Sequence, residues 1–152
     1  MSRPEKPFVL LVDDNDATCT LVTAILHREF VVEIATHGLE AVDKLRTGNY
    51  AAVLLDLRMP QLDGFGVLEF VKVNRPDLLA RILVLTAALS KREMDRVKEY
   101  AICGVISKPF EVETLLAAVK TCAGGNGSTL GTFFSSSMLL LLADLLSRQK
   151  WM

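Results

Sequence analysis

Five short apolar runs alternate along the chain with segments of helical periodicity, and this alternation limits the possible folds more than any other feature. Each run has five or six residues, the length of a strand buried on both faces of a sheet. The loops between the segments are short. The pattern predicts an α/β fold, with a doubly wound parallel sheet, helices on both faces and right-handed crossovers. The runs are residues 8–12, 31–35, 51–55, 81–86 and 102–107.

Five helices are expected, one after each strand. The first can be capped by Asp14 or Asn15, and the fourth by Ser90. The third ends before Pro76, because the residue that precedes a proline avoids the helical conformation. The expected helices cover about residues 15–28, 39–48, 65–74, 90–100 and 111–122.

Composition excludes several classes of protein. The 152 residues suit one folded domain with a short appendage. Seventeen basic and eighteen acidic residues give a net charge of -1, which provides no electrostatic footprint for nucleic acid. The N-terminus has no apolar signal core, so we expect a cytoplasmic protein. Cys19, Cys103 and Cys122 are odd in number and lack metal-ligand spacing, and we expect them to be reduced thiols in the core.

A carboxylate directly follows the apolar run at residues 51–55. A charge does not belong in a buried strand, so Asp56 is either part of a ligand site at the carboxyl end of the strand or a turn residue before Met59 and Pro60. The same position on other strands is polar too. These residues are Asp13 and Asp14, Thr86, and Lys108.

These strand-end side chains are expected to lie together, because the carboxyl ends of parallel strands meet at one rim of a sheet. Two carboxylates 4 Å apart repel by roughly 4 kcal/mol at an effective dielectric constant near 20, so a cluster of three calls for a cation. Oxygen ligands that leave room for water and phosphate favour Mg²⁺ or Mn²⁺ over zinc. Neither His27 nor His37 has ligand spacing to the cluster.

A divalent metal beside one carboxylate, with a lysine ammonium opposite, is a setting for phosphoryl transfer onto that carboxylate. In this hypothesis Asp56 attacks in line, Lys108 and the metal neutralise the phosphoryl charge, and Thr86 offers its hydroxyl to a phosphoryl oxygen. Each residue alone has a plain structural explanation, such as a helix cap for Asp14 or a surface position for Lys108. Their coincidence at matching strand ends favours the functional interpretation.

At these motifs the sequence resembles the receiver domain of two-component response regulators. The resemblance covers about residues 8–123 and implies a flavodoxin-like sheet with the strand order 2-1-3-4-5. The motifs that carry it are LLVDDN at 10–15, LLDLRMPQLDGF at 54–65, LVLTA at 83–87 and SKPF at 107–110.

The resemblance also implies roles for the site residues. Asp56 would accept a phosphoryl group from a sensor histidine kinase or a phosphotransfer protein. Thr86 and Lys108 would report that group to the surface of the fourth helix and fifth strand, and the bond before Pro109 would be cis, which aims the lysine into the site. Mg²⁺ would be held by Asp13, Asp14, Asp56 and the backbone carbonyl of Arg58.

One position departs from the family pattern. Three residues before the lysine, response regulators usually carry a Tyr or Phe whose rotamer follows the switch hydroxyl, and here the residue is Val105. A valine cannot make that swing. The conformational signal from Thr86 to the outer face therefore passes through other residues or is lost. The chemistry at Asp56 does not depend on this signal.

The sequence changes character after Ala123. We expect a receiver domain at 1–123, a flexible linker at 124–132 and an apolar, amphipathic helix at 133–152. This last segment lacks the basic residues and second helix of a helix-turn-helix DNA reader, and its apolar stretch is short for a membrane span. We expect a stand-alone receiver whose last helix packs on its own domain or on a second copy of the chain, in preference to a membrane surface.

The site residues and the tail are compatible with three classes of function. The leading hypothesis is a phosphorylation-switched module that binds a downstream protein which the sequence does not identify. The alternative is a phosphorylation-independent interaction or oligomerisation module with a vestigial acidic site, motivated by Val105 and the apolar tail. A phosphohydrolase is disfavoured, because haloacid-dehalogenase-like enzymes need a second Asp where this chain has Arg58. We therefore expect no enzyme, and at most slow loss of phosphate from Asp56.

Overall fold

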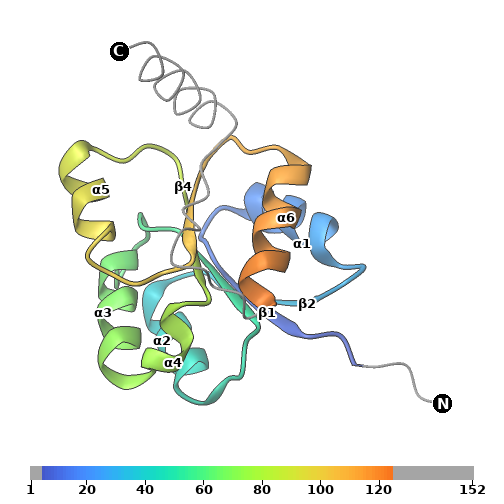
Figure 1. Cartoon of the computed structure of the whole chain (residues 1–152), viewed down its shortest axis with the longest axis horizontal. Coiled ribbons are helices and arrows are strands. Elements are labelled where there is room, and N and C mark those ends of the chain that lie inside the picture. Colours follow the sequence, from blue (N-terminus) through green and yellow to red (C-terminus); the bar gives the residue numbers. More distant parts are fainter. Residues whose placement is uncertain (1–4, 125–152) are drawn as a thin grey trace, which may run out of the picture.

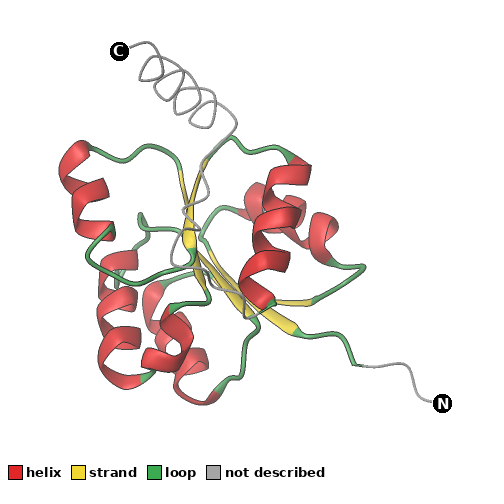
Figure 2. Ribbon diagram, in the orientation of Figure 1, coloured by secondary structure: helices red, strands yellow, loops and turns green. Residues whose placement is uncertain are grey.

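The computed structural model describes residues 5–124, in which a five-stranded sheet lies between two layers of helices (Figures 1 and 2). All neighbouring strands are parallel, and their order is β2-β1-β3-β4-β5. This topology confirms the predicted flavodoxin-like α/β fold. The strands are β1 (Phe8–Val12), β2 (Val31–Ala35), β3 (Ala52–Leu55), β4 (Ile82–Thr86) and β5 (Gly104–Ser107).

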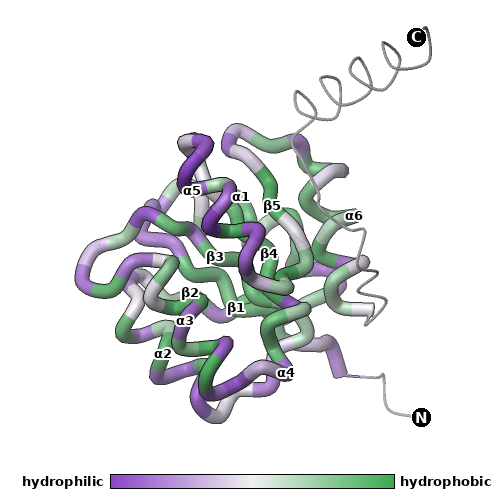
Figure 3. The backbone as a smooth tube through the Cα atoms, turned by 60° about the vertical axis from the view of Figure 1, so that its left-hand side comes forward, coloured by the Kyte–Doolittle hydropathy of each residue, from purple (hydrophilic) through white to green (hydrophobic). Residues whose placement is uncertain are grey.

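The helices cover the two faces unequally. Buried side chains of α1 and α6 pack with one set of strand residues, and those of α2, α3, α4 and α5 pack with the other. Successive residues of a strand point to opposite faces, so each strand contributes to both cores. Figure 3 shows the strands as the hydrophobic centre of the described chain. The helices are α1 (Asp16–Leu26), α2 (Gly38–Thr47), α3 (Gly64–Asn74), α4 (Pro76–Leu79), α5 (Lys91–Val97) and α6 (Val112–Ala123).

The helix α4 was not expected. It is one turn long and begins at Pro76, which suits the first position of a helix because its fixed φ is helical and its missing N–H would have no helical partner. The predicted cap at Ser90 is present, since its hydroxyl accepts a hydrogen bond from the Glu93 N–H. The first helix is capped by Asn15, one of the two residues considered.

Several expectations concern residues 125–152 and lie outside the described part of the chain. They include nearly all of the linker predicted at 124–132 and the whole helix predicted at 133–152. Within residues 5–124, no helix is long and apolar enough to cross a membrane.

The expectation of reduced thiols was wrong for two of the three cysteines. Cys103 and Cys122 form a disulfide between the residue before β5 and the end of α6, whereas Cys19 is free and buried. Their separation of 19 residues gave no pairing signal. Only the packing of α6 against the sheet brings their Cα atoms to 6.0 Å, within disulfide range.

Reduction of this disulfide is expected to lower the free energy of unfolding by about 3 kcal/mol, because a closed loop of about 20 residues restricts the unfolded chain by that amount. Urea unfolding with and without a phosphine reductant measures the difference. The double variant Cys103→Ala/Cys122→Ala is the control and should not respond to the reductant. Titration of three free thiols in the unreduced, unfolded protein would show that the bond does not form.

Candidate functional site

The carboxyl ends of four strands bring the predicted site residues to one rim of the sheet. Val12 at the end of β1 pairs with Leu55 at the end of β3, so Asp13 and Asp56 leave neighbouring strands at the same level. Thr86 at the end of β4 pairs with Ser107 of β5. Lys108 follows immediately, and its backbone N–H donates to the Thr86 carbonyl at 2.7 Å.

Lys108 lies between two carboxylates. Its Nζ is 2.6 Å from Oδ2 of Asp13 and 3.5 Å from Oδ2 of Asp56. The other oxygen of Asp56 accepts two hydrogen bonds, from the Thr86 hydroxyl at 3.3 Å and from the Arg58 N–H at 3.1 Å. The Lys108–Pro109 peptide bond is cis, as the resemblance implied. The structure therefore places the predicted hydroxyl and the predicted ammonium each in contact with the predicted acceptor.

The acidic groups of the site differ in burial. Asp13 is completely buried and Asp56 is 7% exposed, whereas Asp14 is exposed. Besides its ion pair with Lys108, Asp13 accepts a hydrogen bond from the Asn15 N–H at 2.9 Å. A groove of about 480 Å³ opens on the solvent side, with Asp14 and Arg58 among its lining residues.

Three carboxylates of the site are close enough to share one cation. Asp13, Asp14 and Asp56 each offer an oxygen, and these three oxygens lie within 4.8 Å of one another. An oxygen-only donor set with one exposed member fits a hard cation that keeps water ligands. Neither histidine belongs to this group. That the Arg58 backbone carbonyl binds the metal stays a prediction. The N–H of the same residue donates a hydrogen bond to Asp56.

Burial raises the pKa of Asp56 above that of a free aspartate. The Arg58 N–H, the Lys108 ammonium and the Thr86 hydroxyl lower this pKa, and the charge of Asp13 raises it further. Burial is the largest of these effects. Keeping Asp56 ionised therefore lowers the free energy of unfolding of the metal-free protein.

This effect predicts that Asp56→Asn stabilises the metal-free protein at pH 7. Because the folded-state pKa is raised, the wild-type protein loses stability as the pH rises through that value. The advantage of the variant should shrink as the pH falls and vanish below about 3.9, the pKa of an unperturbed aspartate. Chemical unfolding in EDTA between pH 3 and 8 measures both free energies. An advantage that grows toward low pH would contradict this sign.

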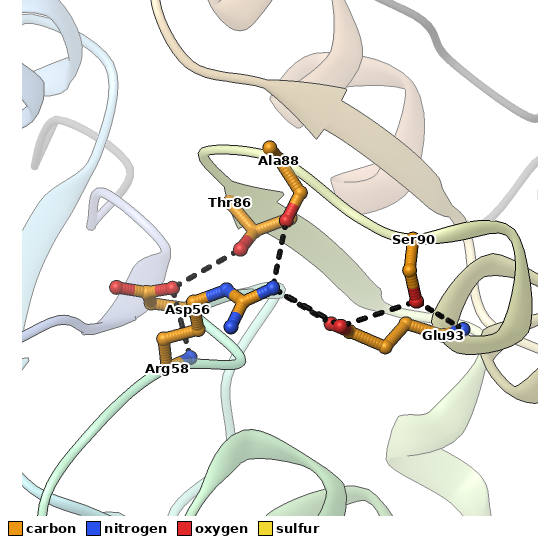
Figure 4. Close-up of polar contacts among 6 residues, drawn as sticks. All are labelled: Asp56, Arg58, Thr86, Ala88, Ser90 and Glu93. Atoms are coloured by element: carbon orange, nitrogen blue, oxygen red, sulfur yellow. Dashed lines mark hydrogen bonds and ion pairs between the residues drawn. The ribbon is translucent and has the colours of Figure 1, made fainter.

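The side chains of Arg58 and Glu93 form a link that sequence reasoning missed. The guanidinium donates to both carboxylate oxygens of Glu93 at 3.1 Å and to the Ala88 carbonyl at 3.0 Å (Figure 4). The spacing of Ser90 and Glu93 carries a helix-capping signal. No local pattern indicates that a residue 35 positions earlier reaches the same carboxylate.

Comparison with known proteins agrees with this geometry. Residues 9–120 match the family model described as the response regulator receiver domain. The chain is similar to a probable chemotaxis protein CheY of Rhizobium etli, at 29% identity over 82% of this chain and 98% of that protein. It is also similar to the response regulator MprA of Mycobacterium sp., at 35% identity over 74% of this chain and 48% of that protein.

Solved structures give the same result for the fold. The non-phosphorylated HemR receiver domain from Leptospira biflexa has a TM-score of 0.70 and 30% identity, over 78% of this chain and 94% of that one. The receiver domain of the sensor histidine kinase PA1611 from Pseudomonas aeruginosa PAO1 has a TM-score of 0.72 and 24% identity, over 80% of this chain and 100% of that one. Against several curated relatives, by contrast, the chain spans about half of their length, 58% for YkoG of Bacillus subtilis.

Proposed function

Because this chain belongs to the family of response regulator receiver domains, we propose that it is a signalling module in which Asp56 accepts a phosphoryl group. The observation that carries the proposal is the set of contacts around this carboxylate. One oxygen of Asp56 faces the Lys108 ammonium, and the other accepts from the Thr86 hydroxyl. Phosphoryl transfer onto a carboxylate uses a nucleophile, a cation that offsets the phosphoryl charge and a hydroxyl that donates to a phosphoryl oxygen.

Each of these residues has a separate task in the proposed reaction. Asp56 attacks the phosphorus of the donor, and the bond between phosphorus and the leaving group breaks as the acyl phosphate forms. Lys108 reduces the negative charge that an approaching phosphoryl group meets beside Asp13 and Asp56. The Thr86 hydroxyl donates a hydrogen bond to an Asp56 oxygen and can donate to a phosphoryl oxygen instead.

Mg²⁺ is the proposed cofactor. Asp13, Asp14, Asp56 and the Arg58 carbonyl would hold it, and bound there it would supply positive charge for the phosphoryl oxygens. The donor set fits this ion, and the PA1611 receiver domain has a magnesium ion coordinated in its active site cleft. Mn²⁺ prefers similar ligands and is expected to substitute.

The proposed partners follow from the chemistry of the acceptor. A sensor histidine kinase or a phosphotransfer protein would donate the phosphoryl group, and a downstream protein would recognise the phosphorylated form. We place this exchange in the cytoplasm. Turnover of phosphate esters is not part of the proposal, because Arg58 offers no acid at the position that haloacid-dehalogenase-like phosphohydrolases use.

Phosphoryl uptake from a phosphorylated histidine donor tests the proposal. We expect transfer from phosphoramidate, a small analogue of phosphohistidine, in the presence of Mg²⁺ and its loss in EDTA. Equal incorporation with and without the metal would contradict the proposed cofactor. Failure of both phosphoramidate and a panel of phosphorylated kinase domains would contradict the proposed acceptor.

One observation favours a second candidate, a phosphorylation-independent interaction module. Val105 is 3% exposed and packed in the core, so it cannot relay a change at Asp56 by swinging outward. Mass in solution with and without beryllofluoride, a phosphoryl mimic, separates the candidates. A partner or oligomer that forms equally in both conditions would favour the second.

A further inference from the structure

Arg58 connects the acceptor carboxylate to α5 through two different parts of one residue. Its backbone N–H donates to Oδ1 of Asp56 at 3.1 Å. Its side chain extends toward α5, where the guanidinium contacts both carboxylate oxygens of Glu93 (Figure 4). A change at Asp56 therefore acts on a residue that already contacts the first turn of α5.

Glu93 in turn holds the start of α5. Its N–H donates to the hydroxyl of Ser90, the N-cap residue, at 3.1 Å, and its Oε1 accepts from the same hydroxyl at 3.2 Å. The helix has seven residues, and Val97, the last of them, is its one buried residue. Short helices are marginal without such end contacts. The position of the Glu93 carboxylate is therefore important for the order of this turn.

The loop between β4 and α5 also depends on Arg58. The Ala88 carbonyl accepts a hydrogen bond from the guanidinium at 3.0 Å, and Ala88 lies two residues after Thr86. The guanidinium therefore contacts the same segment that carries the hydroxyl on Asp56. Arg58 is thus connected to the acceptor twice, through its own N–H and through the segment that follows Thr86.

Resting on the function proposed above, we propose that the Arg58–Glu93 ion pair couples the occupancy of Asp56 to the first turn of α5. A phosphoryl group on Asp56 carries more charge than the carboxylate it replaces and attracts the guanidinium, which binds phosphate as well as carboxylate. Glu93 then loses its partner, and the first turn of α5 is released from the acceptor loop. The ion pair thereby performs the relay that Val105 cannot.

The exposure of the pair suits this role. The Arg58 side chain is 58% exposed and that of Glu93 is 30% exposed, and exposed ion pairs contribute little to folding stability. A link of this kind can open and loosen the first turn of α5 while the rest of the domain stays folded. Coupling requires only that the phosphoryl group and Glu93 compete for one guanidinium.

Amide hydrogen exchange at Glu93 and Met94 tests the link, because both N–H groups bond to Ser90. Beryllofluoride with Mg²⁺ is the probe, and its ¹⁹F signal reports binding to Asp56. We expect it to accelerate exchange of these amides at least about fivefold in the wild-type protein. In Glu93→Gln the ion pair is absent with and without the probe, so exchange of these amides should change less than about twofold when the probe binds.

Asp95→Asn is the matched control, since it removes one charge from an exposed position of the same helix. It should respond as the wild type does. A full response in Glu93→Gln would overturn the inference, and so would a wild-type protein that binds the probe without any change at α5. If the wild-type protein does not bind beryllofluoride, the proposed function fails and the inference falls with it.

Discussion

Asp56→Asn is expected to lower Mg²⁺-dependent phosphoryl uptake from acetyl phosphate by at least about 1,000-fold, a loss on the scale seen when an enzyme loses its nucleophile. An asparagine amide of nearly equal size keeps the shape of the site but cannot form an acyl phosphate. Radiolabelled acetyl phosphate and a filter assay measure the uptake.

Asp63→Asn provides a matched control for this substitution. Asp63 lies on the loop that follows Asp56, is exposed, and caps α3 by accepting a hydrogen bond from the Gly66 N–H. Asparagine caps helices as well as aspartate does, so the control makes the same chemical change without loss of structure. It should label like the wild-type protein. Equal labelling of Asp56→Asn and Asp63→Asn would refute the assignment of the acceptor.

Lys108→Met is expected to slow phosphoryl uptake by about 100-fold, the usual loss when one preorganised donor to a developing charge is removed. The physical reason is the position of the ammonium, 2.6 Å from Asp13 and 3.5 Å from Asp56. Without it, an incoming phosphoryl group meets two carboxylates with no protein cation between them. Rapid-quench labelling of the variant at saturating Mg²⁺ measures the rate.

The same variant should also lose about 2–3 kcal/mol of metal-free stability, because Asp13 is completely buried and loses its ion-pair partner, while Lys108 is itself partly exposed. Mg²⁺ should restore much of this loss by binding to the folded state. Lys98→Met, which changes an exposed lysine at the end of α5, should alter neither quantity measurably. A metal-free Lys108→Met protein as stable as the wild type would contradict the electrostatic account of the site.

The convergence of the site was predictable because it follows from topology. In a parallel sheet, all strand exits lie at one rim, so Asp13, Asp56, Thr86 and Lys108 needed only correct strand ends to be placed together. In the sequence, each of those strand ends is a polar residue that follows an apolar run. The same pattern of apolar runs made the parallel α/β fold predictable.

The features that sequence reasoning missed depend on contacts between distant segments. The Cys103–Cys122 disulfide requires the angle at which α6 packs on the sheet, and periodicity does not specify that angle. The Arg58–Glu93 contact joins the loop after β3 to the first turn of α5, and the relative position of these segments follows from tertiary packing. α4 is a single turn, too short to show a helical period, although its proline at the first position was a usable signal.

The most direct test of the central claim is to locate the modified residue. The protein is incubated with acetyl phosphate and Mg²⁺, the acyl phosphate is reduced with borohydride to homoserine, and the peptides are read by mass spectrometry. We predict homoserine at residue 56, and none there when EDTA is present. Homoserine at Asp13, Asp14 or Asp63 with residue 56 unmodified would contradict the account.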